Sequence, residues 1–430
     1  MFPKKPILLF LLAAVLLLFL SGRAPSPDIK EIISVEKTPA AERALRERDF
    51  DLLMEWEGRI YALAGPAELD ALARLRIPYQ FETHKFSPQI PGRTILQDGM
   101  NGEYHSYLEL EKDLLALEKT YPQQAKVYAI GSSLEQRKIY AIKISDNAAS
   151  QEPETEVLFL GCHHAREWIS VEVPFLLAKY LLEHYSDPAV KSLVDRSEIW
   201  IVPMVNPDGL EYTIHQYRYW RKNRRLNADG SYGIDLNRNY GWNWGYDNTG
   251  SSPNPASEVY RGTAAFSEPE TQAVRGLFLQ HAFRAMISFH SFAQVILYPW
   301  GYTETPADQD ALLNRIAATM AQRIRQINGR SYVFGGAGSV LYVTNGDTTD
   351  WTYGLAGIPS YTIELPPVDE LRGGFFNAET DIQPIFRENL PAMLYLVDWA
   401  IQTSGAGAAE SREKKPGTSP GAGKKILQKD

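Results

Sequence analysis

The sequence predicts a large α/β domain, with helices on both faces of a sheet, that follows a small α+β module. Two observations lead to this prediction. Apolar runs of strand length recur through residues 98–403, and longer segments with helical periodicity separate them. Alternating elements of this kind pack as helices against both faces of one sheet. The chain has 430 residues, which is long enough for two domains and one substantial core.

Strand-like and helical segments alternate through the large domain. The predicted strands are 126–130, 138–144, 156–160, 198–205, 284–289, 294–299 and 358–365. The predicted helices are 107–121, 167–185, 268–282, 308–328 and 381–403. The first helix carries leucines at helical spacing and stops before Pro122, as expected of a helix end.

Residues 25–97 are predicted to form the small module and a linker. Its predicted elements are strands 50–54, 59–63 and 77–81 and a helix 66–72. The helix begins with Pro66, a residue favoured in the first turn. This order gives a β-β-α-β module, and two prolines between Phe86 and Arg93 mark the linker.

The N-terminus has the pattern of an export signal. Lys4 and Lys5 precede an unbroken apolar run from Ile7 to Leu20. This run is shorter than the roughly 20 residues of a spanning helix, so residues 1–24 are predicted to be a signal peptide. An uncleaved anchor through residues 6–21 remains an alternative because the cleavage region is poor. Either way, we expect a secreted or periplasmic protein.

Composition and charge narrow the class of protein. The hydrophobic fraction of 44% and the charged fraction of 22% are those of a globular protein. A net charge of -8 and the absence of a nucleic-acid-binding motif argue against a nucleic-acid partner. The single cysteine, Cys162, excludes an intramolecular disulfide. Residues 404–430 are rich in Gly, Ala, Ser, Pro and Lys, which is typical of a disordered tail.

His164 and Glu167 are the strongest functional signal in the chain. They stand three residues apart, directly after the apolar run 157–161. A His and a carboxylate at this spacing can bind one metal ion from the turn where the strand ends. Catalytic zinc takes three protein ligands, so a third is needed. His290 is the best candidate, because it follows the apolar run 285–289 at a strand end, where sites form in α/β sheets.

The segment Gly-Cys-His-His-Ala-Arg-Glu-Trp-Ile at 161–169 resembles the zinc motif of metallocarboxypeptidases of the carboxypeptidase A/B type. Further motifs follow in that family's order, at 205–209, 220–224, 233–239, 289–291 with 298–299, and 362–365. The pattern is most similar to bacterial carboxypeptidase T-like members. The resemblance implies a mixed eight-stranded sheet, and one zinc ion per chain bound by His164, Glu167 and His290.

The resemblance also implies a reaction: hydrolysis of the C-terminal peptide bond of peptides or proteins. Glu364 takes the role of the base that activates a zinc-bound water. An unpaired buried carboxylate is expensive, so a functional or paired role is also expected from burial alone. Arg221 would stabilise the developing oxyanion, and Asp235 would hold His164 by its other ring nitrogen.

The substrate-binding residues are likewise implied by the resemblance. Asn237, Arg238 and Tyr342 match the positions that hold the free C-terminal carboxylate, for which the planar fork of Arg is suited. Thr349 matches the base of the pocket for the last side chain, with Asp347 two residues earlier. This pair predicts broad specificity for apolar and basic residues. Asp347 has two other interpretations, a turn cap and a ligand of a structural cation.

Several alternatives remain open at this level. One alternative to a carboxypeptidase is a zinc hydrolase of the same fold that acts on cell-wall peptides or acylated amino acids. A further hypothesis is a non-catalytic binding module. Residues 25–97 fit an inhibitory propeptide and a permanent accessory domain equally well. The protein is expected to be a monomer.

Overall fold

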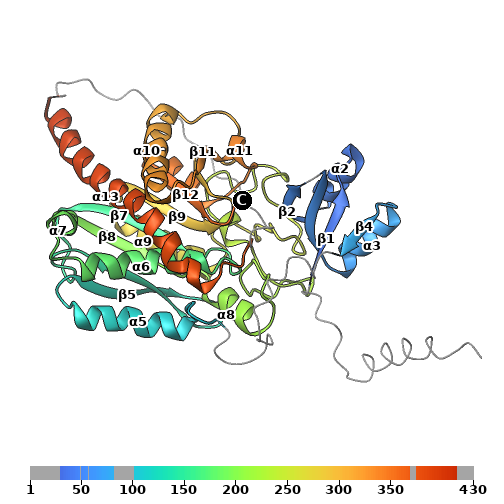
Figure 1. Cartoon of the computed structure of the whole chain (residues 1–430), viewed down its shortest axis with the longest axis horizontal. Helices are drawn as coiled ribbons and strands as arrows, with labels where there is room; N and C mark the ends of the chain where they lie inside the picture. Colours follow the sequence, from blue (N-terminus) through green and yellow to red (C-terminus); the bar gives the residue numbers. More distant parts are fainter. Residues whose placement is uncertain (1–29, 49, 57, 82–100, 369–373, 414–430) are drawn as a thin grey trace, which may run out of the picture.

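A computed structural model describes residues 30–48, 50–56, 58–81, 101–368 and 374–413, and shows the module beside a larger α/β domain (Figure 1). Within these ranges no helix is long and apolar enough to cross a membrane. The predicted signal peptide or anchor and the predicted linker at 86–93 lie outside the described residues.

The N-terminal module is a four-stranded antiparallel sheet with two helices, in the order β2-β3-β1-β4. Its elements are β1 (Glu31–Glu36), α2 (Pro39–Glu47), β2 (Asp51–Trp56), β3 (Arg59–Ala64), α3 (Pro66–Arg74) and β4 (Tyr79–Phe81). The predicted β-β-α-β order was wrong, because it lacked β1 and α2. β1 contains the apolar residues Ile32, Ile33 and Val35, and α2 is strongly amphipathic, so both have local signals that the prediction missed.

The large domain is built on a mixed eight-stranded sheet in the order β11-β10-β12-β9-β7-β8-β6-β5. The strands are β5 (Ala125–Ser132), β6 (Lys138–Ile144), β7 (Thr155–Gly161), β8 (Ser197–Val202), β9 (Ala285–Ser291), β10 (Val295–Tyr298), β11 (Val333–Gly336) and β12 (Ser360–Leu365). The four central strands, β12, β9, β7 and β8, are parallel. Their carboxyl ends therefore meet at one edge of the sheet.

Helices cover both faces of this sheet, as predicted. They are α5 (Tyr107–Thr120), α6 (Ile169–Glu183), α7 (Pro188–Val194), α8 (Pro207–His215), α9 (Pro269–Gln280), α10 (Asp310–Asn328), α11 (Ala337–Val340), α12 (Thr348–Ala356) and α13 (Ile382–Glu413), with 3-10 turns η1 (Leu236–Arg238) and η3 (Glu379–Asp381). One core lies under α5, α6, α10 and α13. A second core, under α9 and α12, covers the other face.

Some predicted boundaries were wrong. α6 begins at Ile169, so Glu167 stands in the turn before the helix. α13 continues to Glu413, ten residues into the predicted tail, and residues 414–430 lie outside the described residues. β11 was not predicted because it has four residues, ends in two glycines and forms the edge of the sheet.

Candidate metal centre and substrate pocket

Neighbouring parallel strands bring the three predicted metal ligands together. β7 ends at Gly161 opposite Phe289 of β9, so the turn with His164 and Glu167 follows one strand while His290 lies on the next. All three side chains are buried, and their ligand atoms lie within 4.8 Å of one another. The structure therefore groups the same three residues that the sequence selected.

The geometry of this group fits a metal cation. His164 Nδ1 lies 2.8 Å from Glu167 Oε1, and His290 Nδ1 lies 3.1 Å from both His164 Nδ1 and Glu167 Oε2. Two imidazole nitrogens that face each other and a carboxylate need a cation or a proton between them. Burial alone would raise the pKa of Glu167, but His164 and His290 hold it well below its usual value. Two nitrogens and one carboxylate form a ligand set typical of catalytic zinc.

Asp235 fixes the orientation of His164. Its Oδ1 lies 3.1 Å from His164 Nε2, which leaves Nδ1 to face the other two ligands. Its Oδ2 accepts hydrogen bonds from Arg221 Nε at 3.1 Å and Nη2 at 2.9 Å. Asp235 is fully buried and also caps η1 by accepting from Asn237 N at 2.9 Å. One carboxylate therefore connects a metal ligand, the predicted oxyanion donor and the substrate-binding turn.

Glu364 lies beside the metal ligands through strand pairing. β12 is parallel to β9, and Glu364 is directly opposite His290 in the register. Burial and the neighbouring Glu167 raise the pKa of Glu364 well above its usual value, while Arg221 and Arg238 act in the opposite direction. A carboxylate at this position beside the candidate metal ligands is a candidate proton acceptor.

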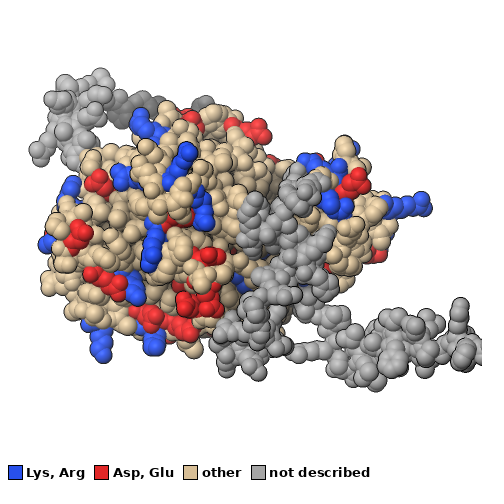
Figure 2. Space-filling model, in the orientation of Figure 1, with Lys and Arg blue, Asp and Glu red and all other residues tan. Residues whose placement is uncertain are grey.

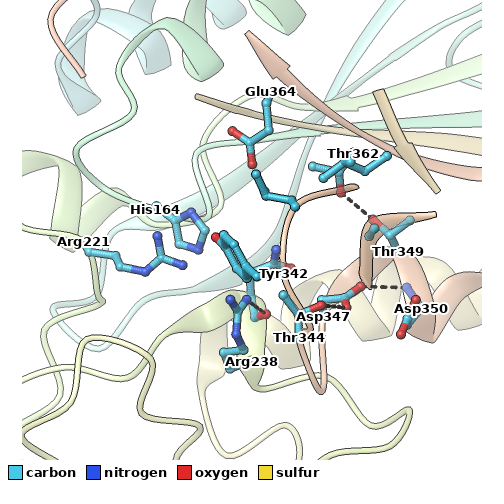
Figure 3. Close-up of a pocket in the computed structure, with 14 residues that line it drawn as sticks. His164, Arg221, Arg238, Tyr342, Thr344, Asp347, Thr349, Asp350, Thr362 and Glu364 are labelled. Atoms are coloured by element: carbon cyan, nitrogen blue, oxygen red, sulfur yellow. Dashed lines mark hydrogen bonds between the residues drawn. The ribbon is translucent and has the colours of Figure 1, made fainter. Parts of the chain in front are cut away.

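One pocket joins the centre to the predicted substrate residues, and Figure 3 shows Arg221, Arg238, Tyr342 and Glu364 around it. Its cavity volume is about 40 Å³. Arg238 donates from Nη1 to Asn237 O at 2.8 Å, whereas its buried Nε has no hydrogen-bond partner among the described residues. An unpartnered guanidinium nitrogen is costly to bury, so it fits an anionic ligand. Tyr342 is half-exposed at the pocket.

The predicted specificity residues line the same pocket. Thr349 Oγ1 lies 2.7 Å from Thr362 Oγ1. Leu297 and Ala337 form an apolar part of the pocket wall. Asp347 is the N-cap of α12 and accepts from Asp350 N at 2.8 Å. The turn-cap interpretation of Asp347 is thus present in the structure, and the carboxylate still lines the pocket.

Two functional candidates escaped the sequence reasoning. Asp350 also lines the pocket, one helical turn after Asp347. The i, i+3 spacing on a helix could have indicated it. Arg166, in the zinc motif itself, is buried and forms a two-point ion pair with Asp51 of the module. No local pattern shows that partner, because 115 residues separate the two.

Two other clusters of potential metal-binding side chains are present in the described residues, but their surroundings differ from those of the candidate metal centre. Glu156, Glu198 and His281 form one of them near the opposite end of β7 and β8. There Lys143 Nζ lies 2.6 Å from Glu198 and already supplies positive charge. The other, Asp146, Glu152 and Glu154, is partly exposed. Neither lies at the edge of the sheet that carries Glu364 and Arg238.

A comparison with protein-family models matches residues 110–392 to the family described as zinc carboxypeptidase. The chain belongs to the zinc carboxypeptidase family. Its resemblance to that family, its mixed eight-stranded fold and its use of zinc are therefore confirmed. The activity that follows is that of a zinc-dependent hydrolase that removes residues from peptide C-termini.

Individual known proteins resemble much of the chain. Carboxypeptidase A1 of Bos taurus is 33% identical over 301 residues, which are 69% of this chain and 70% of that protein. A zinc carboxypeptidase of Saccharothrix mutabilis subsp. capreolus is 34% identical over 386 residues, 84% of this chain and 86% of that protein. The crystal structure of thrombin activatable fibrinolysis inhibitor has 25% identity and a TM-score of 0.73, covering 87% of this chain and 99% of that chain.

Proposed function

We propose that the pocket between Glu364 and Arg238 is the active site of this carboxypeptidase. The observation that carries the proposal is that one pocket contains a candidate metal ligand, a partly buried carboxylate and an unpartnered guanidinium nitrogen. An exopeptidase needs a hydrolytic centre at a fixed distance from an anchor for the free carboxylate. Arg238, with Asn237 and Tyr342, supplies that anchor.

The residues of the pocket divide the chemistry between them. His164, Glu167 and His290 would hold zinc, which when bound supplies a Lewis acid that polarises the scissile carbonyl and acidifies water. Glu364 accepts the proton of the attacking water and passes it to the leaving amine. Arg221 is held by Asp235 through Nε and Nη2, so its guanidinium is fixed beside the pocket to stabilise the oxyanion.

The pocket walls support a broad specificity. Leu297 and Ala337 form an apolar part of the wall that can contact apolar substrate side chains. The hydroxyl groups of Thr349 and Thr362 form a small polar area of the wall. Asp347 adds a carboxylate for basic side chains. The substrates proposed are therefore peptides that end in apolar or basic residues.

The N-terminal module is proposed to act as an inhibitory propeptide. Asp51 forms its ion pair with Arg166, which lies close enough to Glu364 to affect that carboxyl's pKa. Lys30 Nζ lies 3.2 Å from Glu258 Oε1. The backbone N–H of Lys30 donates to the Tyr217 hydroxyl at 3.0 Å, and that hydroxyl donates to the backbone oxygen of Lys30 at 2.9 Å. Ile32, Tyr61 and Leu63 pack against Tyr219. These contacts support docking of the folded module against the segments that carry Arg166, Tyr217 and Tyr219.

The setting of the enzyme is also a proposal. The N-terminal pattern supports export, into the periplasm or the medium, with anchoring through residues 6–21 as the alternative. On the face shown in Figure 2, Lys and Arg side chains are interspersed with Asp and Glu. This mixture supports a peptide rather than a nucleic-acid partner, and a monomer is the assembly proposed.

The test is amino-acid release from peptides that end in Phe, Leu, Arg, Lys and Glu. The full chain and the chain cleaved after the module are compared, each with and without a zinc chelator. We expect chelator-sensitive release of Phe, Leu, Arg and Lys, mainly after cleavage. Peptides with amidated C-termini serve as the control and should be cut poorly. Equal cleavage of amides would instead favour the cell-wall or acyl-amino-acid substrate.

A further inference from the structure

The substrate pocket is lined by two buried carboxylates rather than one. Asp347 is 6% exposed and Asp350 is 1% exposed, and both line the pocket (Figure 3). Both carboxylates lie next to Gly301: a Cβ added there would be 2.7 Å from Asp347 Oδ2 and 3.5 Å from Asp350 Oδ2, so these two oxygens are at most 6.2 Å apart. The two side chains therefore act on the same small region of the pocket.

Each carboxylate has neutral hydrogen-bond donors. Thr344 Oγ1 donates to Asp347 Oδ2 at 2.6 Å. Gly301 N and Tyr302 N donate to the two oxygens of Asp350 at 2.8 Å and 3.0 Å. These donors fix both side chains in position. They supply no full positive charge, and no ion pair to either carboxylate is present within 4.0 Å among the described residues.

The other charged groups of the pocket belong to different elements. Arg238 of η1 and Arg221 lie toward the carboxylate-binding end, and Glu364 of β12 is a further negative group. Arg238 acts to lower the pKa of Asp347, but burial outweighs it and the pKa is raised. Burial and the charge of Asp347 raise the pKa of Asp350 well above its usual value. Two like charges this close cannot both ionise readily without a cation.

We propose that Asp347 and Asp350 select the C-terminal side chain as a pair, which holds one proton beside an apolar side chain and releases it when a guanidinium or ammonium group enters. The carboxyl O–H bond breaks, the proton passes to solvent, and the new carboxylate pairs with the incoming cation. The pair is thus singly protonated when an apolar side chain is bound and fully ionised when a basic side chain is bound. This proposal rests on the proposed function, and adds Asp350 and the shared proton to it.

The sign of the pH dependence follows from the shared proton. At low pH the pair is protonated, so a basic side chain gains little from the pocket. As pH rises through the apparent pKa of the pair, the carboxylates become available and the preference for basic residues increases. A single linked proton gives a change of up to about tenfold per pH unit.

The experiment uses two substrates that differ only in charge: peptides that end in arginine and in citrulline, its neutral isostere. The module-free enzyme is assayed from pH 5 to 9, and the ratio of kcat/KM for arginine over citrulline is plotted. Titration of Glu364 and of groups at the metal centre affects both substrates and cancels in the ratio. We expect the ratio to rise with pH and then level off. A ratio that is flat over this range would overturn the proposal.

Variants separate the pair from a single carboxylate. Asp350→Asn and Asp347→Asn should each move the midpoint of the ratio to lower pH by about one unit or more, because the remaining carboxyl has lost its like-charged neighbour. Asp308→Asn removes an exposed carboxylate outside the pocket and should leave the midpoint unchanged. An unchanged midpoint in Asp350→Asn would overturn the pair. Each variant tests the pair independently, so if one of them fails to fold, the midpoint measured for the other still decides between the pair and a single carboxylate.

The same assay distinguishes failure of the proposed carboxypeptidase function from failure of the proton-sharing pair. If neither arginine nor citrulline is released at any pH, the proposed function is wrong, and the pair proposal falls with it. If both are released with a constant ratio, the carboxypeptidase site stands and only the proton-sharing pair is wrong.

Discussion

Glu364 shows how one residue can be tested without disturbing its surroundings. Glu364→Gln keeps the shape of the side chain but removes the proton acceptor, so kcat should fall by about 10²- to 10⁴-fold. Zinc content should stay the same, because Glu364 is not one of the three grouped ligands. Initial rates and metal analysis of the purified variant check both expectations. Turnover close to that of the wild type would remove Glu364 as the base.

Arg238 can be tested by replacing its planar guanidinium group with the ammonium group of lysine. Arg238→Lys keeps the charge but loses the planar bidentate geometry. We expect KM for peptides with a free C-terminus to rise roughly 10- to 100-fold, the equivalent of about 1.5–3 kcal/mol for a charged hydrogen bond. The matched control is the amidated peptide, for which the variant and the wild type should differ little. Equal losses on both substrates would place the carboxylate anchor elsewhere.

Residues of this kind could be predicted from the sequence where the signal is local or belongs to an ordered set of motifs. His164 and Glu167 are three positions apart, and His290 follows a strand-like run. Asp350 has a weaker signal, its spacing of three residues from Asp347, which matches no motif. Its meaning comes from Gly301 and Tyr302, whose backbone amides reach it from a different loop.

At the scale of elements, the end of β7 determines where the metal ligands stand. Gly161 has no room for a side chain, because an added Cβ would lie 2.8 Å from Pro203 O and still closer to Ser170 O. Gly161→Ala should therefore displace the strand end, lower zinc affinity and destabilise the fold by about 1–3 kcal/mol. Denaturant unfolding and metal titration measure the two effects.

Gly276 provides the matched control for that substitution. It lies within α9, and an added Cβ would meet nothing within 4 Å. Gly276→Ala should stabilise the protein by about 0.4–1 kcal/mol, because it restricts the unfolded chain. The same chemical change therefore has opposite signs at the two sites. A neutral Gly161→Ala variant would show that the strand end can adjust.

At the scale of the whole molecule, the contact between Asp51 and Arg166 is the feature most open to test. Burial would raise the pKa of Asp51, but Arg166 lowers it below its usual value of 3.8. Docking is therefore strengthened by this pair above that value, and the gain is lost as pH falls below it. We therefore expect no change in docking from this pair between pH 5 and 8, because Asp51 stays ionised there.

Asp51→Asn should weaken that docking. Breaking a buried ion pair leaves Arg166 uncompensated at a cost of about 3–5 kcal/mol, so activity of the full chain should rise roughly tenfold or more. The module-free enzyme gives the upper limit. Asp70→Asn, at an exposed position of the same module, is the control and should leave activity unchanged. Equal activity with and without the module would favour a permanent accessory domain.

The sequence alone determined the class of the large domain and the family, and it selected the candidate metal ligands, because each depends on local periodicity or on motifs in a fixed order. The tertiary structure decided what depends on contacts between distant segments. The central position of β1 in the module, the edge strand β11 and the pairing of Asp51 with Arg166 all belong to this second group. Pairing across more than a hundred residues leaves no periodic trace in either segment, so only the folded chain shows which carboxylate meets which cation.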